Sequence, residues 1–242
     1  NTEDSRVSGQ GKSEDGKQIL SVRVNVLPNV PVTLSMKPRE YIEKSYKFLG
    51  REFYIDERAY IPNEETEILT NYAISLLDAK MTSVDVGTGS GNIAISIALA
   101  LPTATIYAVD VDKKALEVAR MNVAKHKVEN VILQESSYVD DLNISAPDVI
   151  VANLPWGDDR HLLRTSSIEG HNHMPHIALF HERGIMGAYA ELLQSILKKG
   201  WHTVCIFESG VMTENEVQPH IPDGLTWEYL SYDHYSVTKV VF

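Results

Sequence analysis

SVDVGTGSGNIAISIALAL, residues 83–101, places three glycines between an apolar run typical of a buried strand and a second apolar run typical of a helix. Glycine adopts the positive φ of a tight turn, and its missing Cβ lets a ligand approach the backbone. Gly87, Gly89 and Gly91 follow the pattern G-x-G-x-G, whereas the dinucleotide fingerprint has a small residue where this chain has Asn92. The stretch therefore predicts either a ligand-binding loop or a plain tight turn.

Strand-like and helix-like runs alternate on both sides of this stretch. The strands TSVDVG, TATIYAVD, NVILQES, DVIVAN and WHTVCIFES are apolar over much of their length, and helical runs separate most of them. This alternation predicts an α/β fold with a mostly parallel sheet covered by helices on both faces. The last two candidate strands, LTWEYLS and YSVTKVVF, have no helix between them, so we expect them to pair antiparallel.

The composition before the first regular strand changes twice. Residues 1–35 begin with a polar, acidic segment and continue into a proline-containing alternating run, so we expect an extended or disordered arm. We assign residues 36–62 to a small helix plus a hairpin in REFYIDERAYIP, and residues 63–242 to the main catalytic domain. Asn63 is a good N-cap for a helix that we expect to run to about Asp78.

The composition restricts the class of protein. The longest apolar stretch, Ile93 to Leu101, is far shorter than the ~20 residues that span a bilayer, so we expect no transmembrane helix. The single cysteine, Cys205, lies inside the apolar run TVCIF, which predicts a buried structural thiol and a reducing location such as the cytoplasm. A net charge of -11 makes nucleic acid an unlikely partner unless a basic partner supplies phosphate contacts.

The strand that follows the glycine loop ends in a carboxylate. Asp110 lies 19 residues after Gly91, where a carboxylate can accept hydrogen bonds from both hydroxyls of a ribose. Asp112 can instead cap the helix that begins at KKALEVAR, and we expect Asp110 to bind and Asp112 to cap. Together, the glycine loop and this strand end predict a ligand that contains adenosine.

DVGTGSGNIAISIALALPTATIYAVDVDKKALEVARMNVAKH closely resembles the cofactor half of class I S-adenosylmethionine-dependent methyltransferases. IPNEETEIL is similar to the IPRPETE signature of HemK-type release factor glutamine methyltransferases, NLPW stands in the place of their NPPY, and MPHIALF in the place of EPxxAL. The resemblance covers roughly residues 47–242. It implies a Rossmann-like class I methyltransferase fold with a seven-stranded sheet whose last strand is antiparallel, and S-adenosyl-L-methionine as the cofactor. The cofactor-binding residues that it implies are Asp85, Gly87, Thr88, Gly89, Gly91, Asn92, Asp110, Val111, Ser136, Ser137 and Asn153.

The NLPW tetrapeptide would carry the catalytic groups Asn153, Leu154, Pro155 and Trp156. An amide nitrogen is a poor nucleophile because its lone pair is delocalised, so it needs two hydrogen-bond acceptors that hold it in line with the methyl donor. The side-chain oxygen of Asn153 and the carbonyl of Leu154 can supply them. Pro155 restricts the backbone, and Trp156 offers a face on which a planar group can stack. The alternative is a proline turn beside a buried indole.

Several positions depart from the family pattern. Thr66 and Glu67 match IPRPETE, whereas Asn63 and Glu64 do not, so this segment is either a capped helix start or part of the cofactor site. Met174 replaces a family glutamate. Ser136 and Ser137 stand where many relatives carry an acidic residue near the adenine of the cofactor. Tyr138 could pack on the adenine ring. Glu208 and Gly210 in FESG resemble the end of the family's next strand. They are either buried beside the sheet edge or in contact with the substrate.

Five histidines lie between Gly157 and His181, namely His161, His171, His173, His176 and His181. Imidazole is a common metal ligand, but no cysteine lies in this segment. We therefore expect a solvated lid over the substrate and no metal site.

Three function classes remain open. The first is N-methylation of a glutamine side chain in a protein, with a cationic partner such as a translation factor. The second keeps the chemistry but acts on adenine N6 or on a small molecule, and the third is an inactive cofactor-binding scaffold. A nicotinamide-dependent dehydrogenase is a weaker alternative, because Asn92 and the antiparallel end of the sheet do not fit it. The sequence predicts no oligomeric state.

Overall fold

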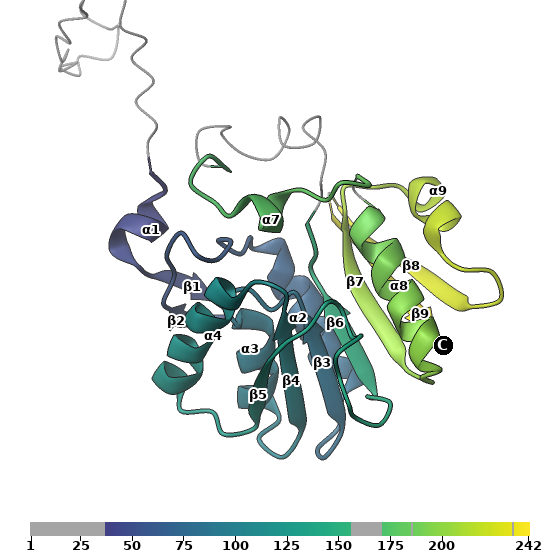
Figure 1. The fold of residues 1–242 in the computed structure, drawn as a ribbon, viewed down its shortest axis with the longest axis horizontal. Helices are drawn as coiled ribbons and strands as arrows, with labels where there is room; N and C mark the ends of the chain where they lie inside the picture. Colours follow the sequence, from purple (N-terminus) through teal and green to yellow (C-terminus); the bar gives the residue numbers. More distant parts are fainter. Residues whose placement is uncertain (1–36, 156–170, 185, 234) are drawn as a thin grey trace, which may run out of the picture. The chain divides into compact units, whose positions relative to one another are not determined.

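The computed structural model describes residues 37–155, 171–184, 186–233 and 235–242 (Figure 1). The expected arm at residues 1–35, Trp156 and His161 lie outside the described residues. The helices and strands are α1 (Arg39–Glu43), β1 (Tyr46–Phe48), β2 (Arg51–Phe53), α2 (Glu65–Leu76), β3 (Thr82–Val86), α3 (Asn92–Ala100), β4 (Thr105–Asp110), α4 (Lys113–His126), β5 (Val131–Glu135), β6 (Val149–Ala152), α7 (His176–Leu179), α8 (Gly187–Lys199), β7 (Val204–Gly210), α9 (Glu214–Val217), a 3-10 turn (Gln218–His220), β8 (Thr226–Tyr232) and β9 (Tyr235–Val241).

The main sheet has seven strands in the order β5-β4-β3-β6-β7-β9-β8. The pairs among β5, β4, β3, β6 and β7 are parallel. β9 runs antiparallel to both β7 and β8, so the last strand of the chain is the reversed one. The predicted class I Rossmann-like sheet, including its antiparallel end, is therefore confirmed.

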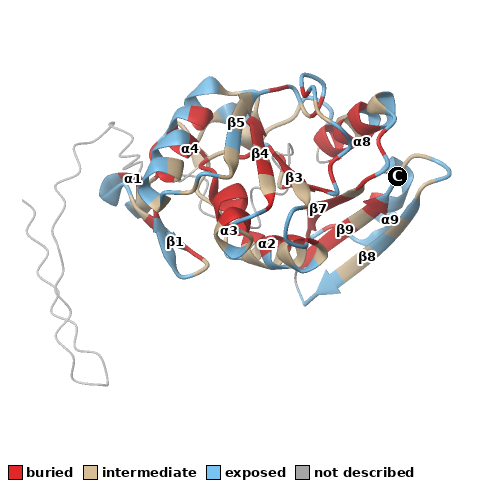
Figure 2. Cartoon of the chain, turned by 90° about the horizontal axis from the view of Figure 1, so that it is seen from below, coloured by how far each residue is buried: buried red, intermediate tan, exposed pale blue. Residues whose placement is uncertain are grey.

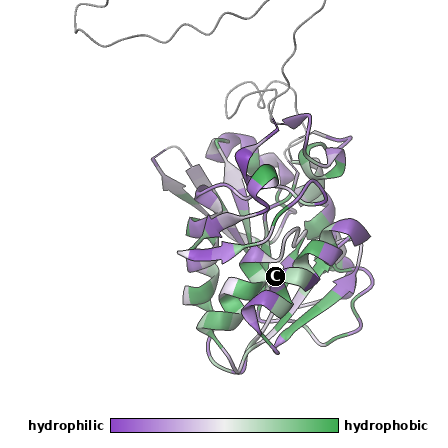
Figure 3. Cartoon of the chain, turned by 90° about the vertical axis from the view of Figure 1, so that its left-hand side faces the viewer, coloured by the Kyte–Doolittle hydropathy of each residue, from purple (hydrophilic) through white to green (hydrophobic). Residues whose placement is uncertain are grey.

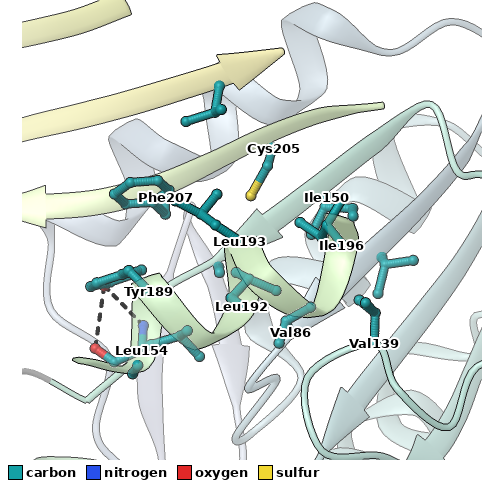
Figure 4. Close-up of a cluster of buried hydrophobic side chains, with 14 of the residues drawn as sticks. Val86, Val139, Ile150, Leu154, Tyr189, Leu192, Leu193, Ile196, Cys205 and Phe207 are labelled. Atoms are coloured by element: carbon teal, nitrogen blue, oxygen red, sulfur yellow. Dashed lines mark hydrogen bonds between the residues drawn. The ribbon is translucent and has the colours of Figure 1, made fainter. Parts of the chain in front are cut away.

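Helices cover both faces of this sheet (Figure 2). On one face, α8 presents Tyr189, Leu192, Leu193 and Ile196, a spacing that places all four on one side of a helix. These side chains pack on β-strand residues that include Cys205, which is fully buried as predicted (Figure 4). On the other face, α2 and α3 pack on the alternate residues of the same strands. Because each of these helices packs on the sheet with one side only, the described helices carry both hydrophobic and hydrophilic residues (Figure 3).

The hairpin lies earlier in the chain than the sequence predicted. It pairs Tyr46 with Phe53 and Phe48 with Arg51, so only the first three residues of REFYIDERAYIP form a strand. A two-residue hairpin turn of type I′ requires positive φ at both central residues. Leu49 and Gly50 supply it, with φ of 47° and 72°. The turn therefore forms at this glycine.

The long helix after the hairpin has Glu64 at its N-cap position, without a side-chain cap bond, and not Asn63 as predicted, but Asn63 still binds the first turn. Asn63 Oδ1 accepts a hydrogen bond from the backbone N–H of Thr66 at 3.1 Å. The helix ends at Leu76, two residues before the predicted end, because Leu77 is extended. Glu67 lies in the first turn and accepts a hydrogen bond from Leu49 N at 2.6 Å, which joins the hairpin turn to this helix.

A buried asparagine on α4 holds the hairpin segment against the glycine loop. Asn122 Oδ1 accepts from Tyr54 N at 2.7 Å, and its Nδ2 donates to Tyr54 O at 2.9 Å and to Ser90 O at 2.8 Å. Tyr46 adds a second link, since its hydroxyl lies 2.7 Å from Ser90 Oγ. The position of the glycine loop therefore depends on residues that precede the main sheet.

We expect Asn122→Ala to lower the free energy of unfolding by about 2–4 kcal/mol, because three buried backbone groups lose their partner. Urea unfolding followed by circular dichroism measures the change. Asn143→Ala, at an exposed position, is the matched control and should change stability by less than about 0.5 kcal/mol. Equal stability of the two variants would contradict this account.

Candidate functional site

A cavity of about 980 Å³ opens where the glycine loop, the ends of β4 and β6, α7 and the segment before α2 meet. In an open α/β sheet, ligands bind beyond the carboxyl ends of the strands. Most of the described residues that the sequence singled out line this cavity. They are Gly87, Thr88, Gly89, Asn92, Asp110, Val111, Ser136, Ser137, Asn153, Leu154 and Pro155.

Two of the predicted cofactor residues lie behind the loop and do not line the cavity. Asp85 is fully buried, and its Oδ2 accepts from Thr88 Oγ1 at 2.6 Å and from Ala94 N at 3.1 Å. Gly91 packs on α4, where an added Cβ would lie 3.3 Å from Ala119 Cβ. Both residues shape the loop from beneath.

The glycine loop lies close to Leu154, just after the end of β6. Gly87 has a φ of +71°, and a Cβ at this position would lie 2.8 Å from Leu154 Cδ2. A side chain at residue 87 would therefore push against the strand end that carries Asn153. Glycine is required here both for the backbone conformation and for the contact.

Asp110 was predicted to bind the ligand and Asp112 to cap the next helix, and the structure bears on the second of these predictions. Asp112 caps α4 by accepting from Lys114 N at 2.9 Å, which confirms its capping role. Asp110 accepts from Gly89 N and from Asp112 N, both at 2.9 Å, so it ties the end of β4 to the glycine loop. Asp110 also lines the cavity, where a carboxylate can accept further hydrogen bonds. Burial raises the pKa of Asp110 above its usual value.

Residues that follow β5 also line the cavity. Ser136 is buried, and its Oγ accepts from Asp141 N at 3.2 Å. Tyr138 has a φ of 50° and donates its hydroxyl to Glu191 Oε2 at 3.0 Å, on helix α8. The tyrosine hydroxyl is thus engaged with α8, while both residues still line the cavity.

The orientation of the Asn153 amide follows from a chain of hydrogen bonds. The backbone N–H of Thr66 can only donate, so the atom that receives it must be Asn63 Oδ1. That oxygen also contacts Thr66 Oγ1, so the threonine hydroxyl must donate to it. Thr66 Oγ1 then accepts from Asn153 Nδ2 at 2.8 Å.

The consequence for Asn153 is that its amide nitrogen faces α2 and its oxygen is left for another partner. No described residue donates a hydrogen bond to Asn153 Oδ1, and the residue lines the cavity. The side chain therefore presents a hydrogen-bond acceptor, held in place by Thr66.

The peptide groups of Leu154 are held from the other face of the sheet (Figure 4). Leu154 N donates to Tyr189 Oη at 3.1 Å, and the tyrosine hydroxyl donates back to Leu154 O at 3.3 Å. A carbonyl oxygen has two lone pairs, so one remains available. Asn153 Oδ1 and Leu154 O are therefore two acceptors on consecutive residues, each positioned by a different helix.

Sequence reasoning missed Tyr189 and left the role of Glu208 open. Tyr189 reads as an ordinary core residue of an amphipathic helix, and the sequence contains no signal for its bond to Leu154. Glu208 is 1% exposed and lines the cavity, with Oε2 3.4 Å from Thr66 Oγ1. A charged residue in the apolar strand CIFES was the available signal for a special site.

The segment from residue 171 to residue 181 borders the same cavity, as Met174, Pro175 and Ile177 show. Among residues 37–155, 171–184, 186–233 and 235–242, no group of three or more His, Cys, Asp or Glu side chains is placed to hold a metal ion. None of the helices described in those ranges is a candidate for a bilayer-spanning segment.

Comparison with known proteins gives consistent matches. Residues 66–208 match the family model described as ribosomal protein L11 methyltransferase (PrmA). A release factor glutamine methyltransferase of Flavobacterium psychrophilum is 36% identical over 156 residues, 60% of this chain and 53% of that protein. A bifunctional methyltransferase of Rickettsia typhi is 34% identical over 178 residues, 65% of this chain and 34% of that protein. The resemblance seen in the sequence is thereby confirmed.

The chain spans between 34% and 63% of the length of the first four curated relatives that it matches. Among solved structures, the ribosomal protein L11 methylase of Lactobacillus delbrueckii subsp. bulgaricus has a TM-score of 0.54 at 18% sequence identity. That match covers 77% of this chain and 82% of the other. It shows a shared fold.

The buried carboxyl beneath the glycine loop predicts a specific pH dependence of stability. Burial raises the pKa of Asp85 to about 7 from a usual value near 3.8. Between these two pH values the folded state binds more protons than the unfolded state, so stability falls as pH rises through this window. We expect the difference in unfolding free energy between wild type and Asp85→Asn to change by up to about 1.4 kcal/mol per pH unit there.

Urea unfolding at several pH values between 4 and 8 measures this difference. Asp78→Asn, at an exposed position, is the control and should follow the wild-type curve. A wild-type and Asp85→Asn pair whose stabilities run parallel across this range would contradict the assignment.

Proposed function

Because the chain belongs to the ribosomal protein L11 methyltransferase (PrmA) family, we propose that it is an S-adenosylmethionine-dependent N-methyltransferase that acts on a glutamine carboxamide in a protein. The observation that carries this proposal is the orientation of Asn153, whose Nδ2 is bound to Thr66 while its Oδ1 is left to accept. Two adjacent acceptors match the two N–H groups of a carboxamide.

The residues present at the glycine loop fit S-adenosylmethionine. Asn92 is 5% exposed and lines the cavity, and its Nδ2 is a buried donor with no partner among the described residues. A buried donor without a partner lowers the stability of the fold by about 1–3 kcal/mol, and a bound ligand that accepts from it would remove this cost. Asp110 would bind the ribose hydroxyls, and Val111, which is half-exposed, would pack on the adenine. When bound, the cofactor supplies a methyl group on a positively charged sulfur.

The catalytic work of this chain is positioning. Asn153 Oδ1 and Leu154 O would each accept one N–H of the carboxamide, which restricts the nitrogen to one orientation. Bonds to both hydrogens also favour pyramidal geometry, so the lone pair localises on the nitrogen. The nitrogen gains a methyl group and releases one proton to water. Correct orientation alone can lower the activation free energy of such a reaction by several kcal/mol.

The protein substrate is proposed from two observations. Several relatives at 30–36% identity are named release factor glutamine methyltransferases. A net charge of -11 favours a cationic protein partner over nucleic acid alone. We also propose a reducing location such as the cytoplasm, because Cys205 is a buried thiol. Adenine N6 or a small molecule as acceptor, and an inactive scaffold, are the outcomes that would replace this proposal.

We expect Asn153→Ala to lower kcat for methyl transfer to a glutamine-containing basic peptide by about 10²-fold or more, because one of the two acceptors is lost. A radiolabelled methyl-transfer assay measures the rate. Calorimetric titration with S-adenosylhomocysteine should show that cofactor affinity changes much less, since the glycine loop is intact.

Asn143→Ala is the control for this experiment and should retain wild-type rates. The scaffold alternative would be favoured if wild type binds the cofactor but transfers no methyl group to peptides, to adenine-containing RNA or DNA, or to small amides. Transfer to nucleic acid alone would favour the adenine alternative.

We expect Asp110→Asn to weaken S-adenosylhomocysteine binding by about 10-fold to 100-fold, because an amide cannot accept hydrogen bonds at both of its heavy atoms. Calorimetric titration measures the dissociation constant. Asp78→Asn should bind as wild type does. Unchanged affinity of the Asp110→Asn variant would remove Asp110 from the cofactor site.

A further inference from the structure

We propose that Glu191 is a positioning residue for the cofactor, because its carboxylate joins two segments that line the cavity. One segment follows β5 and contributes Tyr138, and the other follows α7 and contributes His181. Glu191 lies on α8 and lines the cavity with them. This inference deepens the proposed function and rests on its placement of the cofactor, with the ribose at Asp110.

The segment after β5 lies against the strand end that would hold the ribose. β5 pairs with β4 in parallel, and Asp110 is opposite Glu135. The contact continues past the end of both strands, since Ser136 N donates to Asp110 O at 3.1 Å. Tyr138 follows two residues later, so we expect the part of the wall that it forms to border the adenosine of the cofactor.

The backbone of Tyr138 adopts a conformation that needs support from its surroundings. Its φ is 50°, in the left-handed region that residues other than glycine rarely adopt. Residues of this kind persist where neighbouring contacts hold them, and they cluster at ligand sites. The hydroxyl of Tyr138 donates to Glu191 Oε2 at 3.0 Å, and burial together with this carboxylate raises the pKa of the phenol. Glu191 therefore anchors the end of a neutral tyrosine side chain.

Other residues of α8 bind the same segment. Glu191, Ser195 and Lys199 follow one another at intervals of four residues, which places them on one side of the helix. Ser195 Oγ accepts from Val139 N at 3.3 Å, and Lys199 Nζ donates to Asp140 O at 2.7 Å. This side of α8 thus binds three consecutive residues, and Glu191 holds the first of them, which lines the cavity.

The segment after α7 is attached to the same carboxylate. The backbone N–H of Arg183 can only donate, so His181 Nδ1 accepts it at 3.3 Å, and a neutral ring carries its proton on Nε2. That nitrogen lies 3.4 Å from Glu191 Oε2, and Arg183 Nη1 lies 3.3 Å from Oε1. The ring also packs on the start of α8, because a Cβ added to Gly187 would overlap it. One carboxylate therefore binds groups from both segments.

A carboxylate suits this position because both of its oxygens accept and neither donates. Partial burial raises the pKa of Glu191, but its hydrogen bonds and charged neighbours outweigh this effect and hold the pKa below its usual value. Without the carboxylate, the described contact that still joins the two segments here is the one between Tyr138 Oη and His181 Nε2, at 3.4 Å. We therefore expect its loss to loosen the wall beside the adenosine and to leave Asn153 and Leu154 in place.

The test compares ligand binding by wild type, Glu191→Ala and Glu191→Gln in calorimetric titrations. The two ligands are S-adenosylhomocysteine and 5′-methylthioadenosine, which share the adenosine part. Glu191→Ala should bind both ligands about 10-fold more weakly and by the same factor, because the shared part is the one affected. Glu191→Gln keeps an acceptor for Tyr138 and should bind both within about threefold of wild type.

A double-mutant cycle decides whether Glu191 acts through Tyr138. Tyr138→Phe removes only the hydroxyl and should weaken binding of both ligands by about threefold to 10-fold. In the Glu191→Ala background the same change should have almost no further effect, since the partner of the hydroxyl is already gone. Losses that add would overturn the proposal, as would an unchanged affinity of Glu191→Ala or a loss confined to S-adenosylhomocysteine.

The matched control is Glu182→Ala, an exposed glutamate of the same segment as His181, which should bind both ligands as wild type does. Urea unfolding of each variant separates loss of positioning from loss of folding. If Glu191→Ala does not fold, Tyr138→Phe decides alone, and an affinity equal to that of wild type overturns the proposal.

Kinetics separate this inference from the proposed function. With the glutamine peptide, Glu191→Ala should raise KM for S-adenosylmethionine about 10-fold and retain kcat within about threefold, because the two acceptor oxygens are intact. A fall in kcat with unchanged KM would overturn the positioning role. Absence of transfer to glutamine by wild type would defeat the proposed function instead, and the titrations would still decide the role of Glu191.

Discussion

The hydrogen bond from the backbone N–H of Thr66 to Asn63 Oδ1 is the constraint on which the candidate site depends. It joins Asn63 to the first turn of α2, and its direction is unambiguous because a backbone N–H cannot accept. From it follow the donor role of the Thr66 hydroxyl, the inward-facing nitrogen of Asn153 and the free acceptor oxygen of the same amide. The first turn of α2 thus sets the orientation of the Asn153 side-chain amide, just after the end of β6.

The sandwich architecture explains how two neighbouring residues can be held so differently. Asn153 is held by α2 on one face of the sheet, and the peptide of Leu154 is held by Tyr189 of α8 on the other. The glycine loop contributes from a third direction, since Gly87 leaves room for the Leu154 side chain. A single strand end therefore combines two acceptors that are positioned independently, as a carboxamide requires.

The sequence predicted the elements whose signals are local. Apolar strands, the glycine turn, the cap at Asp112 and the antiparallel last pair could all be recognised from neighbouring residues. The hairpin was misplaced because its turn depends on positive φ at Leu49 and Gly50, and leucine carries no signal for it. The bond between Thr66 and Asn153 joins residues 87 positions apart, so only the folded chain reveals it.

The most direct test of the central claim is a crystal structure of the chain with S-adenosylhomocysteine and a glutamine-containing peptide. The account predicts the carboxamide nitrogen within hydrogen-bond distance of Asn153 Oδ1 and Leu154 O, with Asn153 Nδ2 still bound to Thr66. A peptide glutamine bound away from these two oxygens, or an Asn153 amide turned so that its oxygen faces Thr66, would contradict it.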